Sequence, residues 1–186
     1  MTPRVPTLVC VVLLAAACSG AATGVGDGSG PSVDATRTTA QDAPSIPPGR
    51  LQPSEGFAVT EIVFTDGGRR VPLSAFVADN ADLRATGLMG RTDLPDDAGM
   101  LFVFDAATTG AFWMKDTLLP LSIAFVGEDG TVQQILDMDP CTAEPCRRYA
   151  PDDAYVYAVE ANQGYFTQRG IEAGWSAEID HGGGGR

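Results

Sequence analysis

Histidine is almost absent from this sequence of 186 residues. The one histidine, His181, lies in a glycine-rich C-terminal tail, which is a poor position for the base of a Ser–His or Cys–His mechanism. The glycine patterns of a phosphate-binding loop and of a dinucleotide-binding fold are missing as well. None of these catalytic templates fits the sequence, and we expect the protein to use no cofactor.

Basic residues are also scarce. The chain has 12 Lys and Arg residues against 24 Asp and Glu residues, for a formal net charge of −12. An acidic surface repels the phosphate backbone of DNA and RNA, so we expect no nucleic-acid partner. The same charge disfavours docking on anionic lipids through a basic patch.

The N-terminal apolar run, residues 8–17, is shorter than the roughly 20 residues that a membrane-spanning helix needs. With Arg4 before it and small residues at its end, it resembles a secretory signal peptide. Residues 14–18, LAAAC, resemble a bacterial lipobox, with Ala15 where leucine is usual. We therefore expect a lipoprotein-type signal peptide over 1–17 and a lipid on Cys18 that anchors the protein to the extracytoplasmic side of the cell membrane. The alternative is an ordinary signal, cut near Ala17, and a secreted protein.

Large apolar residues are nearly missing from residues 18–54, which are rich in Gly, Ser, Thr, Ala, Pro and Asp. Such a segment cannot bury enough surface to offset its chain entropy. We expect it to be a flexible tether that carries a globular domain over 55–181, followed by a flexible tail over 182–186.

The domain contains two cysteines, Cys141 and Cys146, which are separated by four residues. A redox pair normally has two residues between its cysteines, and a zinc site would need further ligands that this sequence does not offer. We therefore expect no metal. In an exported protein the pair is typical of a structural disulfide that closes a short loop.

The domain shows short β-branched and aromatic runs separated by turn signals, without long helices between them. This pattern predicts a β-rich α+β fold: a compact, partly closed antiparallel sheet, barrel-like, with two short helices. Pro72 suggests an edge position for its strand. The predicted strands are 57–65, 71–78, 100–104, 111–115, 121–126, 131–137, 154–161 and 175–179, and the predicted helical segments are 81–89, ended by Gly90, and 163–169.

Several ordered motifs resemble the DUF192 family over nearly the whole domain. They are GLMGR at 87–91, LP at 94–95, GMLFVF at 99–104, FWMKDT at 112–117, PLSIAF at 120–125 and VEA at 159–161. The resemblance implies a small bacterial or archaeal protein, often exported, with no established activity. Asp116 stands where the family commonly has asparagine, so a carboxylate that only accepts hydrogen bonds replaces an amide that also donates them.

The candidate site residues are Arg91, Trp113, Lys115, Asp116 and Glu160, which lie within these motifs. Our hypothesis is that they meet beside the aromatic cluster and form a pocket for a small anionic ligand, with arginine binding a carboxylate or phosphate through its two-pronged guanidinium. The alternative is a structural network, with ion pairs from Arg91 or Lys115 to Glu160. Trp113 and Met114, adjacent on one strand, should face opposite ways.

We therefore expect a binding or accessory module of the cell envelope. Two other functions stay open. One is a hydrolase-like enzyme that uses Asp116, Glu160 and Lys115. The other is a module that binds an envelope protein through the aromatic residues around Trp113.

Overall fold

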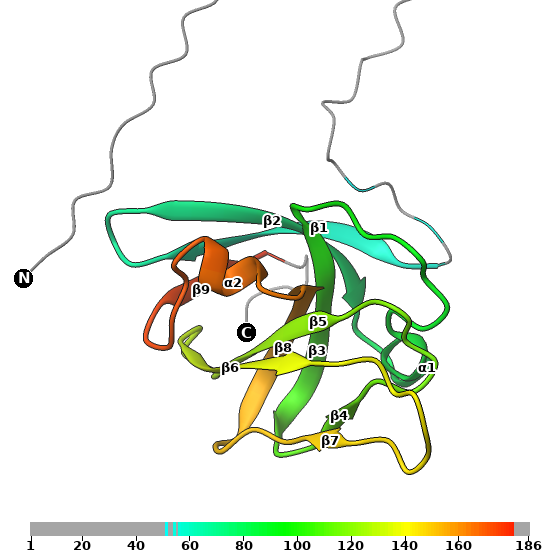
Figure 1. Cartoon of the computed structure of the whole chain (residues 1–186). Coiled ribbons are helices and arrows are strands. Elements are labelled where there is room, and N and C mark those ends of the chain that lie inside the picture. Colours follow the sequence, from blue (N-terminus) through cyan, green and yellow to red (C-terminus); the bar gives the residue numbers. More distant parts are fainter. Residues whose placement is uncertain (1–50, 52–53, 55, 181–186) are drawn as a thin grey trace, which may run out of the picture. The chain divides into compact units, whose positions relative to one another are not determined.

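The computed structural model describes residues 51, 54 and 56–180, which all belong to the compact unit Ala43–Arg186 (Figure 1). The predicted signal peptide, the lipidation site Cys18, most of the predicted tether and the C-terminal tail lie outside these residues. In the described part of the chain, neither helix is long and apolar enough to cross a membrane.

A mixed sheet of seven strands forms the body of the domain, in the order β6-β5-β8-β3-β2-β1-β9, and β4 and β7 form a separate pair (Figure 1). The strands are β1 Ala58–Thr65, β2 Arg70–Ala78, β3 Ala98–Thr108, β4 Phe112–Trp113, β5 Leu121–Val126, β6 Val132–Met138, β7 Arg148–Tyr149, β8 Tyr155–Asn162 and β9 Ser176–Ile179; the helices are α1 Ala81–Thr86 and α2 Tyr165–Gln168.

The predicted fold class is confirmed: the domain is rich in strands, has two short helices and is partly closed. The sheet is not a complete barrel, but its two edge strands meet at one end. There Thr131 and Ser176 form an isolated bridge, and the Ala177 amide donates to the Gly130 carbonyl at 2.7 Å. All strand pairs within the sheet are antiparallel except β2 and β3, which run parallel. A parallel pair needs a crossover connection, and α1 lies in that connection.

Two local predictions are wrong. Strand β2 lies between β1 and β3, so it is not an edge strand. Its pairing with β3 starts only at Ser74, so at Pro72 strand β2 is paired with β1 alone. Helix α1 ends at Thr86, before the predicted stop at Gly90. Gly87 has a φ of +50° and donates its amide to the Leu83 carbonyl, which closes the last turn.

Buried side chains form two clusters, one on each face of the sheet. Because side chains alternate along a strand, Met100 and Phe102 of β3 join the first cluster while Leu101 joins the second. Helix α2 contributes Tyr165 and Phe166 to the second cluster. The first cluster is covered by the segment after α1 and by the β4–β7 pair, through Leu88 and Tyr149. The candidate site lies on this first face.

Candidate functional site

Glu160 is a carboxylic acid buried within the sheet. It lies on β8 between Met100 of β3 and Ile123 of β5, and only 5% of its surface is exposed. Its side chain lies on the face of the first apolar cluster, since Ala158, two residues earlier, belongs to that cluster. The carboxyl group makes no hydrogen bond or ion pair with any residue that the structure describes. Loss of hydration on burial raises the pKa of Glu160 to about 8.

The Glu160 side chain lines a pocket of about 290 Å³. Its largest apolar and aromatic lining residues are Leu88, Met89, Phe102, Phe112 and Trp113. Two cations, Arg84 and Arg148, line it together with the acid. The pocket thus has aromatic walls, one buried acid and two basic residues of greater exposure.

Helix α1 and the segment after it form one wall of this pocket. The helix is capped by Asn80, whose side-chain oxygen accepts the Leu83 amide at 3.0 Å. Arg84 ties the helix to β3, because its Nη1 donates to the Val103 carbonyl at 2.8 Å. The Gly90 amide donates to the Asp116 carbonyl at 2.9 Å, which joins the segment after the helix to the turn after β4.

The β4–β7 pair forms another wall. Trp113 is opposite Arg148 in this pair, and the Arg148 guanidinium carbon lies 4.4 Å from the centre of the indole ring. Trp113 is 38% exposed, whereas Met114 is 1% exposed, so the two adjacent side chains point in opposite directions as predicted. Arg148 has this ring contact but no hydrogen bond or ion pair with a residue of the described chain. Its guanidinium donors are therefore available to a ligand.

The structure brings two of the five predicted site residues together, because Trp113 and Glu160 line the same pocket. Lys115 and Asp116 line a different hollow, beside the Cys141–Cys146 loop, where the Lys115 ammonium lies 3.8 Å from a Glu144 carboxylate oxygen. The Lys115 ammonium also lies 5.5 Å from the centre of the Trp113 ring, so Lys115 stays beside Trp113 without lining the Glu160 pocket. Arg91 lines neither hollow.

Arg91 instead packs over the Phe76 ring at 4.3 Å and donates to the Ser54 hydroxyl at 3.4 Å. The ion pairs from Arg91 or Lys115 to Glu160, which a structural network would need, do not form.

Sequence reasoning missed Arg84 and Arg148. Arg84 lies within the predicted helical segment 81–89, where nothing in the sequence set it apart. Arg148 lies between the predicted strands 131–137 and 154–161, and a strand of two residues has no detectable alternation.

A comparison with protein families now identifies the domain. The profile of DUF192, described as "Uncharacterized ACR", matches residues 62–179. The chain belongs to the DUF192 family. No curated protein matches it.

Two solved structures resemble the DUF192 domain. One is a candidate transcription regulator from Sinorhizobium meliloti 1021, with 31% sequence identity and a TM-score of 0.61, over 66% of this chain and 94% of the other. The second is a protein of unknown function from Novosphingobium aromaticivorans DSM 12444, with 28% identity and a TM-score of 0.64, over 69% of this chain and 91% of the other. Both matches cover nearly all of the solved chain, so the whole DUF192 fold is shared.

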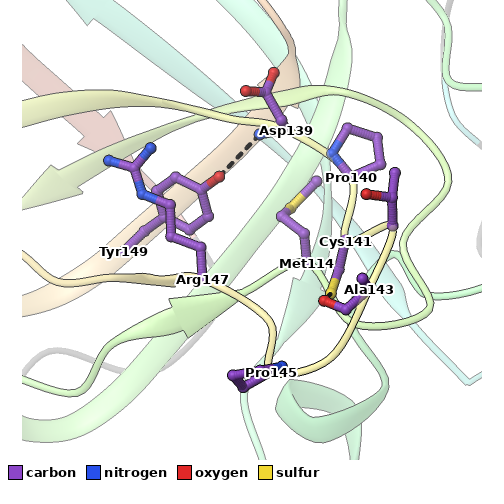
Figure 2. Close-up of a pocket in the computed structure, with 9 residues that line it drawn as sticks. Met114, Asp139, Pro140, Cys141, Ala143, Pro145, Arg147 and Tyr149 are labelled. Carbon is purple, nitrogen blue, oxygen red and sulfur yellow. Dashed lines mark hydrogen bonds between the residues drawn. The ribbon is translucent and has the colours of Figure 1, made fainter.

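The predicted disulfide between Cys141 and Cys146 is present in the DUF192 domain. Its loop lines a second pocket, of about 300 Å³, that is shown in Figure 2. In that pocket the Tyr149 hydroxyl accepts the Asp139 amide at 3.1 Å, and the Arg147 guanidinium lies 4.8 Å from the Tyr149 ring (Figure 2). The Tyr149 hydroxyl and the Asp139 amide are thus paired with each other, whereas the Arg147 guanidinium, like that of Arg148, has a ring contact but no hydrogen bond or ion pair in the described chain. In the described part of the chain, no three His, Cys, Asp or Glu side chains are grouped so that they could hold a metal ion.

Asp116, which lines the hollow at the disulfide loop, has an unusual backbone conformation. Its φ is +53°, the only positive φ of a non-glycine residue in the described chain, and its exposed side chain makes no hydrogen bond or ion pair there. Asparagine and aspartate adopt this left-handed conformation more readily than other residues with a side chain. In alanine, the close approach of Cβ to the carbonyl oxygen destabilises the same conformation.

We expect Asp116→Ala to lower the free energy of unfolding by about 1 kcal/mol. Asp116→Asn should leave it unchanged or raise it by a few tenths of a kcal/mol, because asparagine keeps the backbone geometry and removes a charge. Urea denaturation of the two variants measures the difference. Equal stability of the two variants would contradict a role for the Asp116 backbone.

Proposed function

We propose that this protein is a lipoprotein tethered to the extracytoplasmic side of the cell membrane, and that its DUF192 domain binds a small ligand in the Glu160 pocket. The observation that carries this proposal is the buried Glu160 carboxyl group, which lines a pocket and lacks a protein partner. Buried polar groups are almost always hydrogen-bonded, since leaving one unpaired is costly. A bound ligand that supplies the missing partner accounts for a glutamate at this position.

Ligand binding can be tested by recording the indole NMR signal of Trp113 while a chemically diverse set of small molecules is added to the full chain. We expect some members of the set to shift this signal while the signal of Trp175, which is only 7% exposed and belongs to the other cluster, stays in place. Glu160→Gln should weaken their binding about tenfold or more. Glu61→Gln, at an exposed position of β1, is the matched control and should have no effect.

The binding proposal fails if no compound of the set moves the Trp113 signal. It also fails if Glu160→Gln and Glu61→Gln bind every compound as the unchanged protein does.

The proposed membrane tether is supported by the lipobox-like residues that precede Cys18 and by the Cys141–Cys146 disulfide, since disulfides persist mainly in oxidising compartments outside the cytoplasm. We expect the chain produced in a bacterial host to partition into the detergent phase, because two or more acyl chains anchor a protein stably. Cys18→Ser should move it to the aqueous phase, whereas Cys10→Ser should not. Detergent partition of the Cys18→Ser chain like that of the unchanged chain would exclude the lipid anchor.

Two other functions receive less support. A hydrolase that combines Asp116, Lys115 and Glu160 would need these groups in one pocket, but Asp116 and Lys115 line a different hollow. Gene regulation by direct DNA binding is one reading of the name of the Sinorhizobium protein. A net charge of −12 opposes contact with DNA.

A further inference from the structure

We infer that the ligand of the Glu160 pocket is a small zwitterion with an apolar side chain: its ammonium group pairs with Glu160, its carboxylate pairs with Arg148, and its apolar part packs on the aromatic wall. A free amino acid of apolar side chain has this chemistry. The inference rests on the proposed binding function and names the class of ligand.

The ammonium group is assigned from the buried end of the pocket. Glu160 is 5% exposed, and no cation of the described chain is paired with it. A carboxylate without a counter-ion is costly in a largely apolar site, and a ligand cation with several N–H donors supplies both the charge and the hydrogen bonds. Binding of an ammonium group therefore favours the ionised form of Glu160, and the proton that the carboxyl group carried passes to solvent.

The carboxylate is assigned from the exposed side of the pocket. Arg148 is exposed, is held over the Trp113 ring and has no acceptor in the described chain. A guanidinium fixed in this way can bind a carboxylate through two parallel hydrogen bonds. Arg84, the other cation of the pocket, already donates to the Val103 carbonyl. A ligand with a positive charge alone would meet two arginines, and one with a negative charge alone would leave Glu160 without a partner.

The size of the ligand is assigned from the volume of the pocket, and its apolar part is assigned from the apolar residues that line the pocket. Phe102, Phe112 and Leu88 are apolar residues at the pocket, and Trp113 adds an indole face. The volume of about 290 Å³ lies close to the lower limit of the range of ligand pockets, roughly 300–1,000 Å³, so the pocket suits a molecule of amino-acid size.

Two series of probes with a constant apolar part test the inference on the full chain. One series is L-leucine, 3-methylbutylamine, 4-methylpentanoate and 3-methylbutan-1-ol; the other is L-phenylalanine, 2-phenylethylamine, 3-phenylpropanoate and 2-phenylethanol. We expect the zwitterion of at least one series to bind about tenfold or more tightly than its three relatives, as measured from the Trp113 indole signal. Below pH 8 the affinity of the amine should rise as the pH increases, since Glu160 must release its proton. Glu160 is the only acid among the residues that line the pocket; the other charged groups are Arg84 and Arg148 in the lining and Lys115, whose ammonium lies 5.5 Å from the Trp113 ring.

Two variants assign the two ends of the ligand. Glu160→Gln should weaken the zwitterion and the amine about tenfold but leave the affinity for the carboxylate within about twofold. Arg148→Gln should weaken the zwitterion and the carboxylate and spare the amine. This crossed pattern would not arise if either variant only disturbed the fold, because a general disturbance weakens all probes.

The inference is overturned if the carboxylate or the alcohol binds most tightly, if both variants weaken all probes alike, or if no probe of either series binds. If other compounds of the diverse set still bind and depend on Glu160, the proposed binding function survives and only the ligand class is wrong. If those compounds fail as well, the binding function is wrong too.

Discussion

Gly99→Ala is expected to destabilise the domain by about 3 kcal/mol, or to prevent folding, because the new methyl group has no space. Gly99 lies on β3, a central strand, opposite Ala75 of β2 and Ala161 of β8. A Cβ atom at this position would be 2.3 Å from the Glu160 carbonyl oxygen and 3.1 Å from a Leu73 methyl group. The first of these atoms is backbone, so the clash cannot be relieved by rotation of a side chain.

The same substitution would displace the part of β8 that carries Glu160, and it should therefore reduce ligand binding together with stability. Gly68→Ala is the matched control. Its Cβ atom would be 3.6 Å from an Asp66 carboxylate oxygen, which is ordinary contact, and its effect should stay within about 0.5 kcal/mol. Urea denaturation compares the two, and equal free energies of unfolding would contradict the close approach of β3 and β8.

The sequence predicted most of the strands because their apolar runs are continuous and their turns carry strong signals. Asp66-Gly67-Gly68 marked the β1–β2 hairpin, which pairs over the full length of β1. The parallel pairing of β2 with β3 was not predicted, since a strand pattern does not tell which strands become neighbours. The β4–β7 pair was predicted only in part, because two paired residues are too few to show alternation.

The candidate site was predicted in part for a similar reason. Trp113, Lys115 and Asp116 are close in sequence, and the expectation was that they would share one rim. The left-handed backbone of Asp116 is part of a turn after β4, and Lys115 and Asp116 line the hollow at the disulfide loop. Lys115 keeps a contact with Trp113, since its ammonium lies 5.5 Å from the centre of the indole ring, but it does not line the Glu160 pocket. Arg148 reaches Trp113 only because β7 pairs with β4.

Glu160 is the residue for which the sequence held the clearest signal. The burial of β8 is nearly complete, and Glu160 is the one ionisable carboxyl group in a strand whose other residues are mostly apolar. Such a strand is typical of a position covered on both faces, where a charged residue is costly. The sequence could not show that the protein supplies no counter-ion, because that depends on the positions of Arg91 and Lys115 in three dimensions.

The stability of the protein is expected to fall as the pH rises from about 4.5 to about 8, and Glu160→Gln should remove this decrease. Burial raises the pKa of Glu160 from 4.5 to about 8, so between these values the folded state holds a proton that the unfolded state has lost. The stabilisation is complete below the unfolded pKa and is lost as the pH rises through the folded pKa. With about 1.4 kcal/mol for each pKa unit, the whole effect is about 4–5 kcal/mol.

The measurement is the free energy of unfolding of the unchanged and Glu160→Gln chains from about pH 3 to about pH 9, and the difference between the two curves isolates Glu160 from the other carboxyl groups. Glu178→Gln is a control of opposite sign. Arg70 lies 2.7 Å from the Glu178 carboxylate and lowers its pKa by hydrogen bonding and charge, so the stability from Glu178 is present above its unfolded pKa and is lost as the pH falls. Its difference curve should therefore change only below about pH 4.5. A Glu160 difference curve that is flat from pH 4.5 to 8 would show that the carboxyl group is hydrated or paired in solution, and the pocket would then lose the unpartnered acid on which its proposed function depends.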